Sequence, residues 1–378
     1  MKKNNVLFIN PGPAYRVTST AFQIKYKYLS AFCSGYIFST SNLPQEEEFY
    51  NFHFVACRSG SGLGATIRYL YFCFKHLLKL KRDGVKLDLI ITYDPLKTGL
   101  IGLLAKSYLG GKLVVEVNGV YDSPVVWEDQ CGNRSNALKK YIFPKVIRFV
   151  LKRSDGIKLL FSGQIDGLGV DLSGKIVDFY FDWVNTELFH STGEDKEVLF
   201  AGFPFRIKGV DILICAFKRI AANHPDWSLK ILGWYPDQTE LEAAIGGHSQ
   251  IFHHLPVSAT EMIDHIGKCG FLVQPSRTEA MGRVLVEAMA AGKARIGTRV
   301  DGIPTVINDG VDGLLVEVEN VEELAEKMDL LIRDEELRRK LGTAASERVR
   351  KEFSAQKYVQ LTSEFYQRVI GAPSRGAL

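Results

Sequence analysis

The sequence predicts an α/β protein made of two doubly wound domains. Short runs of β-branched and other apolar residues alternate with longer segments of helical periodicity along the chain. This alternation restarts after the stretch FDWVNTELF at 181–189. A length of 378 residues also suits two domains better than one. Two successive βαβα series of this kind imply two doubly wound domains that meet at a cleft near residue 185.

The first series predicts a domain over residues 1–185. Four apolar runs in it are typical of buried parallel strands: VLFIN (6–10), LDLIIT (87–92), KLVVEVN (112–118) and GIKLLF (156–161). Helices are expected between them at residues 18–33, 64–82, 95–109 and 136–153.

The second series predicts a domain over residues 186–353. Its strands are expected at EVLFAG (197–202), WSLKILG (227–233), GFLVQP (270–275) and ARIGT (294–298). Its helices are expected at residues 209–223, 259–267, 282–291, 320–333 and 335–352. Residues 354–378 form a last helix and tail, and the sequence leaves open whether this helix crosses back to the first domain.

The composition is typical of a soluble globular protein, with 46% apolar and 24% charged residues. The six cysteines form no C-x-x-C pair and no metal-ligand spacing, so we interpret them as small buried residues in a reducing compartment. The apolar run near the start is too short for a signal peptide, and no segment approaches the roughly 18 apolar residues of a membrane span. We therefore expect a cytoplasmic protein.

Charge is divided unevenly between the two halves. Residues 1–185 carry 24 Lys and Arg against 15 Asp and Glu, a net charge of +9, and the remainder carries 23 against 28, a net charge of −5, which together give +4. Segments 66–82 and 139–153 mix basic, aromatic and aliphatic residues. Each fits a core-facing helix with a solvated basic face, and the alternative is contact with an anionic membrane surface. No recognition motif accompanies the charge, so nucleic acid is not expected as a partner.

The stretch PSRTEAMGRVLVEAMAAG at 275–292 places Glu287 on a helix that is otherwise almost entirely apolar. A buried carboxylate needs a partner, because burying it alone costs several kcal/mol. Arg283, four residues earlier, could form an intrahelical pair, although the order Arg before Glu is the weaker one. The other interpretation is that Glu287 faces a cleft and accepts hydrogen bonds from a polyol. Glu279 precedes the helix and could cap it or bind another ligand hydroxyl.

A second stretch, LFAGFPFRIKGVDILICAF at 199–217, predicts a strand, a loop with Gly202, Arg206 and Lys208, and a helix from about Gly209. Two cations beside a helix N-terminus at the end of a strand suit a phosphate group. The loop is not a Walker motif, and no G-x-G-x-x-G follows the first strand. ATPase and ordinary dinucleotide-binding functions are therefore not favoured.

Taken together, the second half resembles family 4 glycosyltransferases, which are retaining, nucleotide-sugar-dependent enzymes of the GT-B fold with two Rossmann-like domains facing a cleft. The resemblance rests on the two stretches above, on LGWYPDQTELE (232–242) and on DGIPTVINDGVDGLLV (301–316). In the first half it rests on VVEVNGVY (114–121), and FDWVNTELF resembles the family's interdomain hinge.

The resemblance implies a role for each matching residue. Glu279 would contact hydroxyls of the donor sugar, Glu287 would bind the ribose hydroxyls, and Lys208 would bind the donor diphosphate beside Gly202. The arginine that usually follows the loop glycine is replaced by Phe203, and Arg206 is the candidate to supply that charge. Lys208, Arg206 and Glu279 are thus the candidate catalytic residues.

Other positions depart from the family pattern. The loop after the first glutamate reads Ala280, Met281, Gly282 and Arg283 where the family has Gly-Phe-Gly-Leu, so these donor-side residues would reshape the sugar pocket. On the acceptor side, Asn118 stands where a histidine is common, and of the glycine-rich turn after the first strand Gly12 is retained.

The resemblance implies transfer of a sugar from a nucleoside diphosphate sugar to a glycan or lipid-linked acceptor, in surface polysaccharide or glycolipid synthesis. The donor is a co-substrate, and no further cofactor is expected. No D-x-D triplet occurs, which argues against the metal-dependent GT-A type, so no metal site is expected. A lipid-linked acceptor would place the enzyme peripherally at the inner face of the membrane. A nucleotide-sugar epimerase or hydrolase of the same fold and a non-catalytic sugar-nucleotide-binding partner remain as alternatives.

Overall fold

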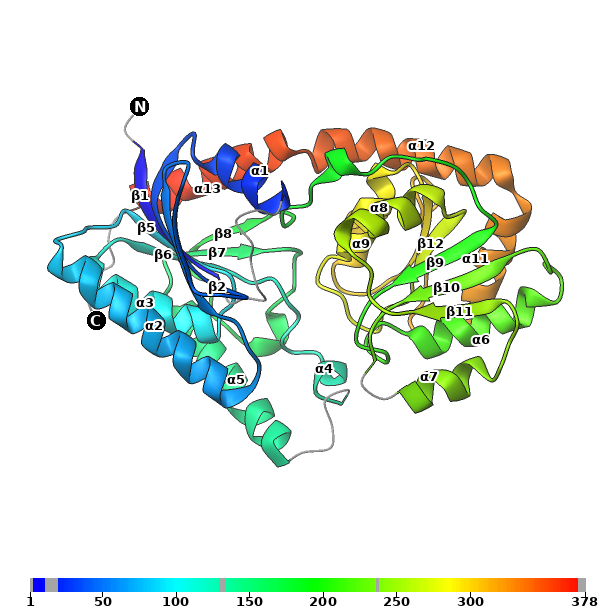
Figure 1. Ribbon diagram of the computed structural model, residues 1–378, viewed down its shortest axis with the longest axis horizontal. Helices are drawn as coiled ribbons and strands as arrows, with labels where there is room; N and C mark the ends of the chain where they lie inside the picture. Colours follow the sequence, from blue (N-terminus) through cyan, green and yellow to red (C-terminus); the bar gives the residue numbers. More distant parts are fainter. Residues whose placement is uncertain (1–2, 11–19, 129–133, 236–237, 373–378) are drawn as a thin grey trace. The chain divides into compact units, whose positions relative to one another are not determined.

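The computed structural model describes residues 3–10, 20–128, 134–235 and 238–372 (Figure 1). The chain forms two compact units. The first consists of Met1–Tyr121, Ala137–Trp183 and Tyr358–Leu378, and the second of Asp122–Asn136 and Val184–Lys357. The C-terminal helix therefore does return to the first unit, which the sequence had left open.

The first unit contains an eight-stranded sheet with the order β3-β4-β2-β1-β5-β6-β7-β8. All neighbouring strands are parallel except β3 and β4. The strands are β1 (Asn4–Ile9), β2 (Cys33–Ser41), β3 (Gln45–Phe49), β4 (Phe52–Arg58), β5 (Leu89–Thr92), β6 (Lys112–Glu116), β7 (Gly156–Leu159) and β8 (Ile176–Phe179).

Four of these strands were not predicted, namely β2, β3, β4 and β8. The edge strand β3 reads QEEEF and is mostly exposed, so it has no apolar pattern to find. It pairs antiparallel with β4 through a turn in which Tyr50 has a φ of 51°. In β2, the sequence CSGYIFSTS mixes small polar residues with a short apolar run, which hides a strand that is buried over its second half.

Helices cover both faces of this sheet (Figure 1). These helices are α1 (Thr20–Leu29), α2 (Gly62–Arg82), α3 (Lys97–Leu109) and α5 (Arg134–Arg153), together with α13 (Ala355–Gly371) from the end of the chain. The short helix α4 (Pro124–Glu128) belongs to the second unit. Residues of α2, α3 and α5 share one apolar core with Leu7 and Ile9 of β1. The alternate residue Phe8 instead packs on Tyr26 of α1, with ring centroids 5.3 Å apart. Successive strand residues thus face opposite helix layers, as a doubly wound fold requires.

The second unit contains a six-stranded parallel sheet with the order β11-β10-β9-β12-β13-β14. The strands are β9 (Glu197–Ala201), β10 (Ser228–Leu232), β11 (Ile251–His254), β12 (Phe271–Gln274), β13 (Ala294–Thr298) and β14 (Leu314–Val316). Numbered within the unit, this is the order 3-2-1-4-5-6 of the Rossmann fold.

Its helices are α6 (Val210–Ala221), α7 (Gln238–Ile245), α8 (Ala259–Lys268), α9 (Arg283–Ala290), α10 (Ile303–Val306), α11 (Val321–Arg333) and α12 (Glu335–Glu352). Several begin at residues that are expected to cap helices. Ser258 and Glu261 form a reciprocal capping box at α8, and the side chains of Asn320 and Asp334 cap α11 and α12. The fold class predicted from the sequence, two doubly wound α/β domains, is confirmed.

Candidate functional site

The second sheet has a topological switch point between β9 and β12. From β9 the chain moves outward to β10 and β11, and then returns to β12 on the other side of β9. In open parallel sheets, ligands bind outside the carboxyl ends of the strands at such a point. The segments that follow these two strands are residues 202–209 and 275–282, and both belong to the stretches that the sequence singled out.

The two segments touch at Gly209. This residue has a φ of +69°, and a Cβ atom on it would lie 2.0 Å from the carbonyl oxygen of Pro275, an approach that only glycine allows. Arg277 joins the segments a second time, because its Nη1 donates to the Arg206 carbonyl at 2.7 Å and to Asp211 Oδ1 at 2.8 Å. Arg277 was not predicted as a site residue from the sequence, because its role depends on Asp211, a partner 66 residues away.

Lys208 and Glu279 form an ion pair where the segments meet. The two side chains are only 18% and 13% exposed, respectively. The Lys208 N–H donates to the Pro204 carbonyl at 3.1 Å, which holds the backbone in a turn immediately before α6. The structure thus brings together the loop cation and the first motif glutamate.

Asp301 fixes the backbone that carries Glu279. Its Oδ2 accepts hydrogen bonds from the Thr278 hydroxyl at 2.5 Å and from the Glu279 N–H at 3.1 Å. The Gly302 N–H donates to the Glu279 carbonyl at 3.0 Å. Asp301 was not predicted as a site residue from the sequence. The overlooked signal is an Asp-Gly pair at the carboxyl end of the strand next to β12.

Glu287 lies one helical turn after Arg283 on α9. The structure contains both features expected from the sequence, namely the pair with Arg283 and an open site that the carboxylate faces. Glu287 Oε1 is 3.2 Å from the Arg283 Nε, and the carboxylate also lines a pocket. The Glu287 side chain is 15% exposed, whereas that of Arg283 is 57% exposed. Burial raises the pKa of the Glu287 carboxyl, and the nearby Arg283 guanidinium offsets only part of this shift. The ion pair therefore does not fully compensate the burial of the carboxylate.

The pocket has a volume of about 550 Å³ and lies within the second unit, at the carboxyl ends of β9, β10 and β12. This volume falls in the range of small-molecule sites. It is lined by Ala201, Gly202, Phe203, Lys208, Leu232, Gly233, Trp234, Pro256, Val257, Met262, Gln274, Glu279, Arg283, Val284 and Glu287. Phe203 and Trp234 are about half exposed and their rings lie 5.5 Å apart, which gives the pocket an aromatic wall for a flat apolar group.

The remaining predicted donor-side residues lie near this pocket but do not all line it. Gly202 lines it, and Gly282 has a φ of +74° where α9 begins. Ala280 and Met281 belong to the same turn but are not among the described residues that line the pocket, and Met281 is buried. Arg206 is not among them either, because its exposed guanidinium lies 3.7 Å from Glu240.

The predicted acceptor-side residues belong to the first unit. Asn118 follows β6, donates to the Tyr93 carbonyl at 3.2 Å and accepts from Lys158 Nζ at 3.4 Å. Lys158 also lies 3.9 Å from Glu116, and both side chains are completely buried. Burial raises the pKa of Glu116, with Lys158 acting against this. Gly12 lies outside the described residues.

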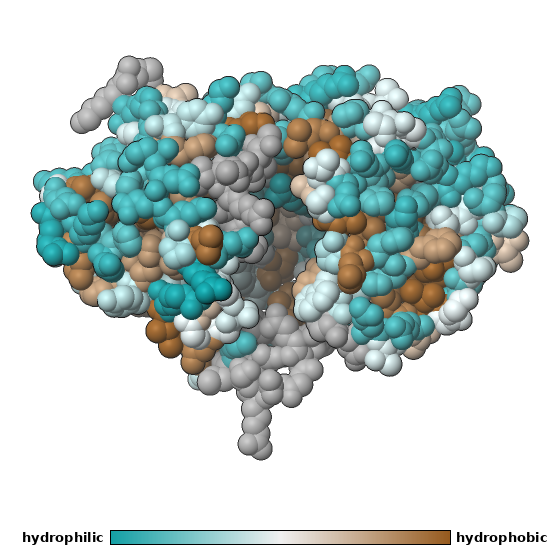
Figure 2. All heavy atoms as spheres, viewed as in Figure 1, coloured by the Kyte–Doolittle hydropathy of each residue, from teal (hydrophilic) through white to brown (hydrophobic). Residues whose placement is uncertain are grey.

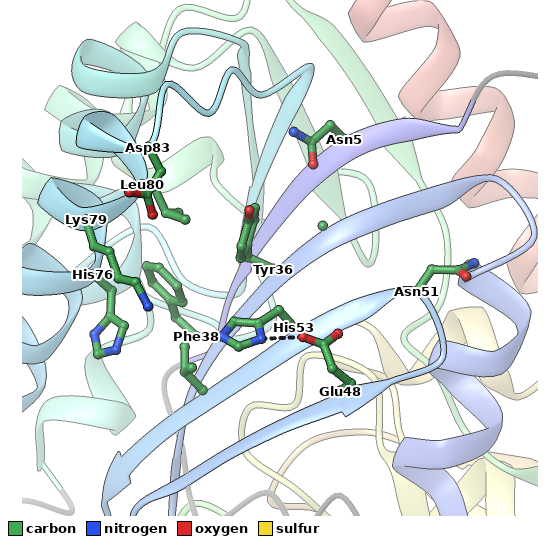
Figure 3. Close-up of a pocket in the computed structure, with 12 residues that line it drawn as sticks. Asn5, Tyr36, Phe38, Glu48, Asn51, His53, His76, Lys79, Leu80 and Asp83 are labelled. Atoms are coloured by element: carbon green, nitrogen blue, oxygen red, sulfur yellow. Dashed lines mark hydrogen bonds and ion pairs between the residues drawn. The ribbon is translucent and has the colours of Figure 1, made fainter.

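A second pocket, of about 410 Å³, lies in the first unit (Figure 3). It is formed by the amino-terminal parts of β1, β2 and β4 and by the end of α2, including Asn5, Tyr36, His53, His76 and Asp83. His53 Nδ1 lies 2.7 Å from Glu48 Oε1 (Figure 3). This pocket is at the opposite edge of its sheet from the carboxyl ends where such folds bind ligands, so we do not assign the chemistry to it.

Within the described ranges, no group of three or more His, Cys, Asp or Glu side chains is arranged to hold a metal ion. Among the helices that the structure describes, none is both long and apolar enough to cross a membrane.

Two Rossmann-like units, the second with a lysine–glutamate pair and another glutamate in a pocket at its switch point, fit the class of GT-B glycosyltransferases. A family model described as "Glycosyl transferases group 1" matches residues 186–348. An uncharacterized glycosyltransferase of Methanocaldococcus jannaschii is 31% identical over 293 residues, which are 76% of this chain and 77% of that protein. The chain belongs to the group 1 glycosyltransferases, and it is a glycosyltransferase.

Further relatives and solved structures agree with this assignment. N-acetyl-alpha-D-glucosaminyl L-malate synthase of Bacillus anthracis is 27% identical over 308 residues, 77% of each chain. Sucrose-phosphate synthase of Thermosynechococcus elongatus has a TM-score of 0.78 at 18% identity, covering 98% of this chain and 100% of that one. Anabaena HepE in complex with UDP and glucose has a TM-score of 0.73 at 15% identity, covering 96% and 99%. At these identities the structural similarities concern the fold alone.

Proposed function

We propose that this protein is a retaining glycosyltransferase that moves a sugar from a nucleoside diphosphate sugar to a glycan or lipid-linked acceptor. The observation that carries the proposal is the convergence of Lys208, Glu279 and Glu287 on one pocket at the switch point of the second unit. A cation and two carboxylates in one pocket match the three parts of such a donor, with the diphosphate in the middle and the ribose and the sugar on either side of it. The diphosphate requires positive charge, and the ribose and the sugar offer hydroxyl donors.

Each residue then has a defined role. The Lys208 ammonium neutralises the diphosphate, Glu279 accepts hydrogen bonds from the sugar hydroxyls, and Glu287 accepts them from the ribose. Phe203 and Trp234 form a wall for the nucleobase. Because Lys208 pairs with Glu279, an incoming diphosphate competes with the Glu279 carboxylate for the lysine and leaves that carboxylate available for the sugar.

Catalysis follows from the charge that develops during the reaction. Breaking the bond between the sugar and the diphosphate builds negative charge on the leaving phosphate, and Lys208 lies beside the N-terminus of α6, where that charge is favoured. The departing phosphate takes the proton of the acceptor hydroxyl on the same face of the sugar, so no side chain is assigned as a general base. The chain has no D-x-D triplet to bind a metal-diphosphate complex, and we assign the charge stabilisation to Lys208.

The donor and acceptor classes can be narrowed further. The HepE structures of similar fold were solved with UDP, with UDP and glucose, and with UDP-glucose, so a uridine diphosphate sugar is the first donor to test. On the acceptor side, Asn118 and the buried Lys158 lie at the carboxyl ends of β6 and β7. Of these two residues, the partly exposed Asn118 can meet a glycan or glycolipid hydroxyl, whereas the buried Lys158 acts only through its hydrogen bond to Asn118. We place the reaction in surface polysaccharide or glycolipid synthesis.

The test compares Lys208→Ala with Lys230→Ala. Lys230 is a matched control because it also pairs with a glutamate in the second unit, Glu197, at 2.6 Å and with 21% exposure. We expect Lys208→Ala to lower turnover at least about tenfold, the low end for losing a charge-stabilising donor, and Lys230→Ala to retain normal turnover. Near-normal turnover of a folded Lys208→Ala variant would remove Lys208 from this role.

Donor consumption, measured with and without a cell-extract acceptor, separates the possible reactions. Turnover that requires acceptor supports transfer. Turnover of donor alone would identify an epimerase or hydrolase, and donor binding without any turnover would identify a non-catalytic binding partner. A thermal-shift panel of UDP-, GDP- and ADP-sugars comes first, because a true donor stabilises the folded state by mass action.

A further inference from the structure

The helices α2, α3 and α5 lie side by side over one face of the first sheet (Figure 1). All three contribute to the same apolar core. α2 packs along α3, and a Cβ atom on Gly99 of α3 would lie 2.7 Å from Val150 of α5, so α3 is the middle helix. Their outward-facing sides therefore form one continuous layer, called here the α2/α3/α5 surface.

The ionisable Lys, Arg, Asp and Glu residues within these three helices are all basic. α2 contains five Lys and Arg, α3 two and α5 seven, which makes 14 over 54 residues without any Asp or Glu. By comparison, α11 and α12 of the second unit contain eight Lys and Arg and eight Asp and Glu over 31 residues. The basic bias is thus a property of this surface and not of the whole chain.

Large apolar side chains are exposed on the same helices. Of the 18 exposed large apolar residues in the described part of the chain, nine lie on α2, α3 and α5. On α2 they are Leu63, Ile67, Leu70, Tyr71 and Phe74, a spacing that places them along one stripe of the helix. Phe74 contacts Tyr108 of α3, with ring centroids 6.4 Å apart. Figure 2 shows apolar and hydrophilic residues interspersed over the visible side of these helices.

The inward face of α2 is packed in the core of the first unit, and the exposed apolar stripe lies on a different face of the helix. Tyr69, Cys73, Leu77 and Leu80 are buried against the sheet. The exposed stripe is therefore not a poorly buried part of the same core, but a second apolar face on the helix. Exposed apolar groups of this kind mark interaction sites.

We propose that the α2/α3/α5 surface binds an anionic lipid bilayer. The basic side chains attract acidic headgroups, and the aliphatic and aromatic stripe enters the boundary between headgroups and acyl chains. Aliphatic residues such as Leu63 and Ile67 distinguish this surface from a nucleic-acid site, where stacking rewards aromatic and not aliphatic side chains. On α5, Lys145 lies over the ring of Tyr141, 3.5 Å from its centroid, and Arg153 lies over that of Phe149, at 3.9 Å. Each such pair presents a cation and an apolar ring together, the combination that suits a membrane interface.

The test is sedimentation of the 378-residue chain with vesicles of phosphatidylcholine alone or with about one third phosphatidylglycerol, at low and high salt. We expect binding only to the anionic vesicles and loss of binding at high salt. Each Lys or Arg near the membrane surface raises the affinity for anionic vesicles about fivefold. The double substitution Arg68→Gln with Lys75→Gln should therefore lower this affinity about 25-fold. Ile67→Ser with Tyr71→Ser should also weaken it, and none of these changes lies in the donor pocket.

Matched control variants come from the second unit. Arg350→Gln with Lys351→Gln removes two exposed basic residues of α12, and Leu255→Ser with Val311→Ser removes two exposed apolar residues. Both controls should bind like the unchanged protein. The proposal is overturned if the protein ignores anionic vesicles at low salt, if it binds neutral vesicles equally well, or if the controls lose as much binding. Binding that responds to the basic but not to the apolar substitutions, and that an RNA oligonucleotide displaces, would indicate a polyanion site instead. Donor turnover provides the check that each variant is folded.

Discussion

Replacing Glu287 by glutamine is expected to weaken donor binding while leaving the fold as stable as before, or more stable. Burial raises the pKa of the Glu287 carboxyl above its ordinary value of 4.5, even though the Arg283 guanidinium lies 3.2 Å away. The ionised carboxylate is thus less favourable in the folded protein than in the unfolded chain. The charge therefore does not stabilise the fold, which fits the donor-binding role proposed for Glu287.

The size of each effect can be bounded. Glutamine loses the i,i+4 pair with Arg283, which is worth about 0.3–0.5 kcal/mol at most because that arginine is mostly exposed. Glutamine also removes the cost of burying the charge. The melting temperature should therefore fall by about 2 °C at most. Hydrogen bonds from ribose hydroxyls to a charged group are worth about 1.5–3 kcal/mol, so the donor Kd should rise about 10- to 150-fold.

The raised pKa of Glu287 predicts how folding stability and donor affinity change with pH. With a folded pKa raised above the unfolded one, the folded state binds the Glu287 proton more tightly, so this residue makes stability fall as pH rises from 4.5 toward its folded pKa. Donor binding has the opposite trend, since a protonated Glu287 no longer offers a charged acceptor. Affinity should therefore decline below this raised pKa, and glutamine should abolish both trends.

Calorimetric titration with the donor found in the thermal-shift panel, together with melting curves between pH 4 and 8, measures these quantities. Glu335→Gln is the control, because it breaks another i,i+4 pair, with Arg339, on the exposed face of α12. The reasoning fails if the Glu287→Gln variant melts more than about 4 °C lower while its donor affinity stays within twofold. In that case Glu287 serves the fold and the ribose assignment is withdrawn.

Two further predictions concern the same unit. Arg283→Met should raise the pKa of Glu287 further, since it removes the group that opposes the burial effect, and the acid decline of donor affinity should move to higher pH; an unchanged pH profile would contradict this. Gly209→Ala should destabilise the second unit in chemical denaturation by more than the roughly 1–2 kcal/mol of a left-handed backbone alone, because its Cβ atom would meet Pro275. Gly247→Ala, with a φ of +70° and no atom within 4 Å of the added Cβ, isolates the backbone cost, and equal losses in the two variants would refute the clash.

The sequence predicted those strands and helices whose own residues carry an apolar or amphipathic pattern. The strands β9, β10, β12 and β13 and the helices α6, α8, α9, α11 and α12 are apolar runs or amphipathic segments with strong boundaries, and they occur where they were expected, whereas the short helices α7 and α10 were not predicted. The polar edge strand β3 depends on pairing with β4 and could not be predicted from its own residues. Arg295, fully buried in β13, is likewise neutralised by Asp312 at 2.7 Å, a partner that no local pattern announces.

In the candidate site, too, residues in recognisable stretches were predicted, and residues whose roles depend on distant partners were not. Glu279, Glu287 and Lys208 could be predicted because they stand in stretches that resemble a known family, and the structure places all three in one pocket. Arg206 was expected beside Lys208 from its position in the loop, but a two-residue offset in a tight turn directs it toward Glu240. Asp301 was missed because its importance arises from hydrogen bonds to a segment more than 20 residues earlier in the chain.

The arrangement of charges in the pocket explains how one site can hold both glutamates. Each carboxylate has a cationic neighbour, Lys208 for Glu279 and Arg283 for Glu287, so the pocket as described carries two balanced pairs. If the roles proposed above hold, the Glu279 carboxylate needs new hydrogen-bond donors once a diphosphate has bound Lys208, and the hydroxyls of the transferred sugar would supply them. Binding the diphosphate and binding the sugar are therefore linked through one exchange of partners, and a donor that lacks the sugar should bind less tightly than the intact one.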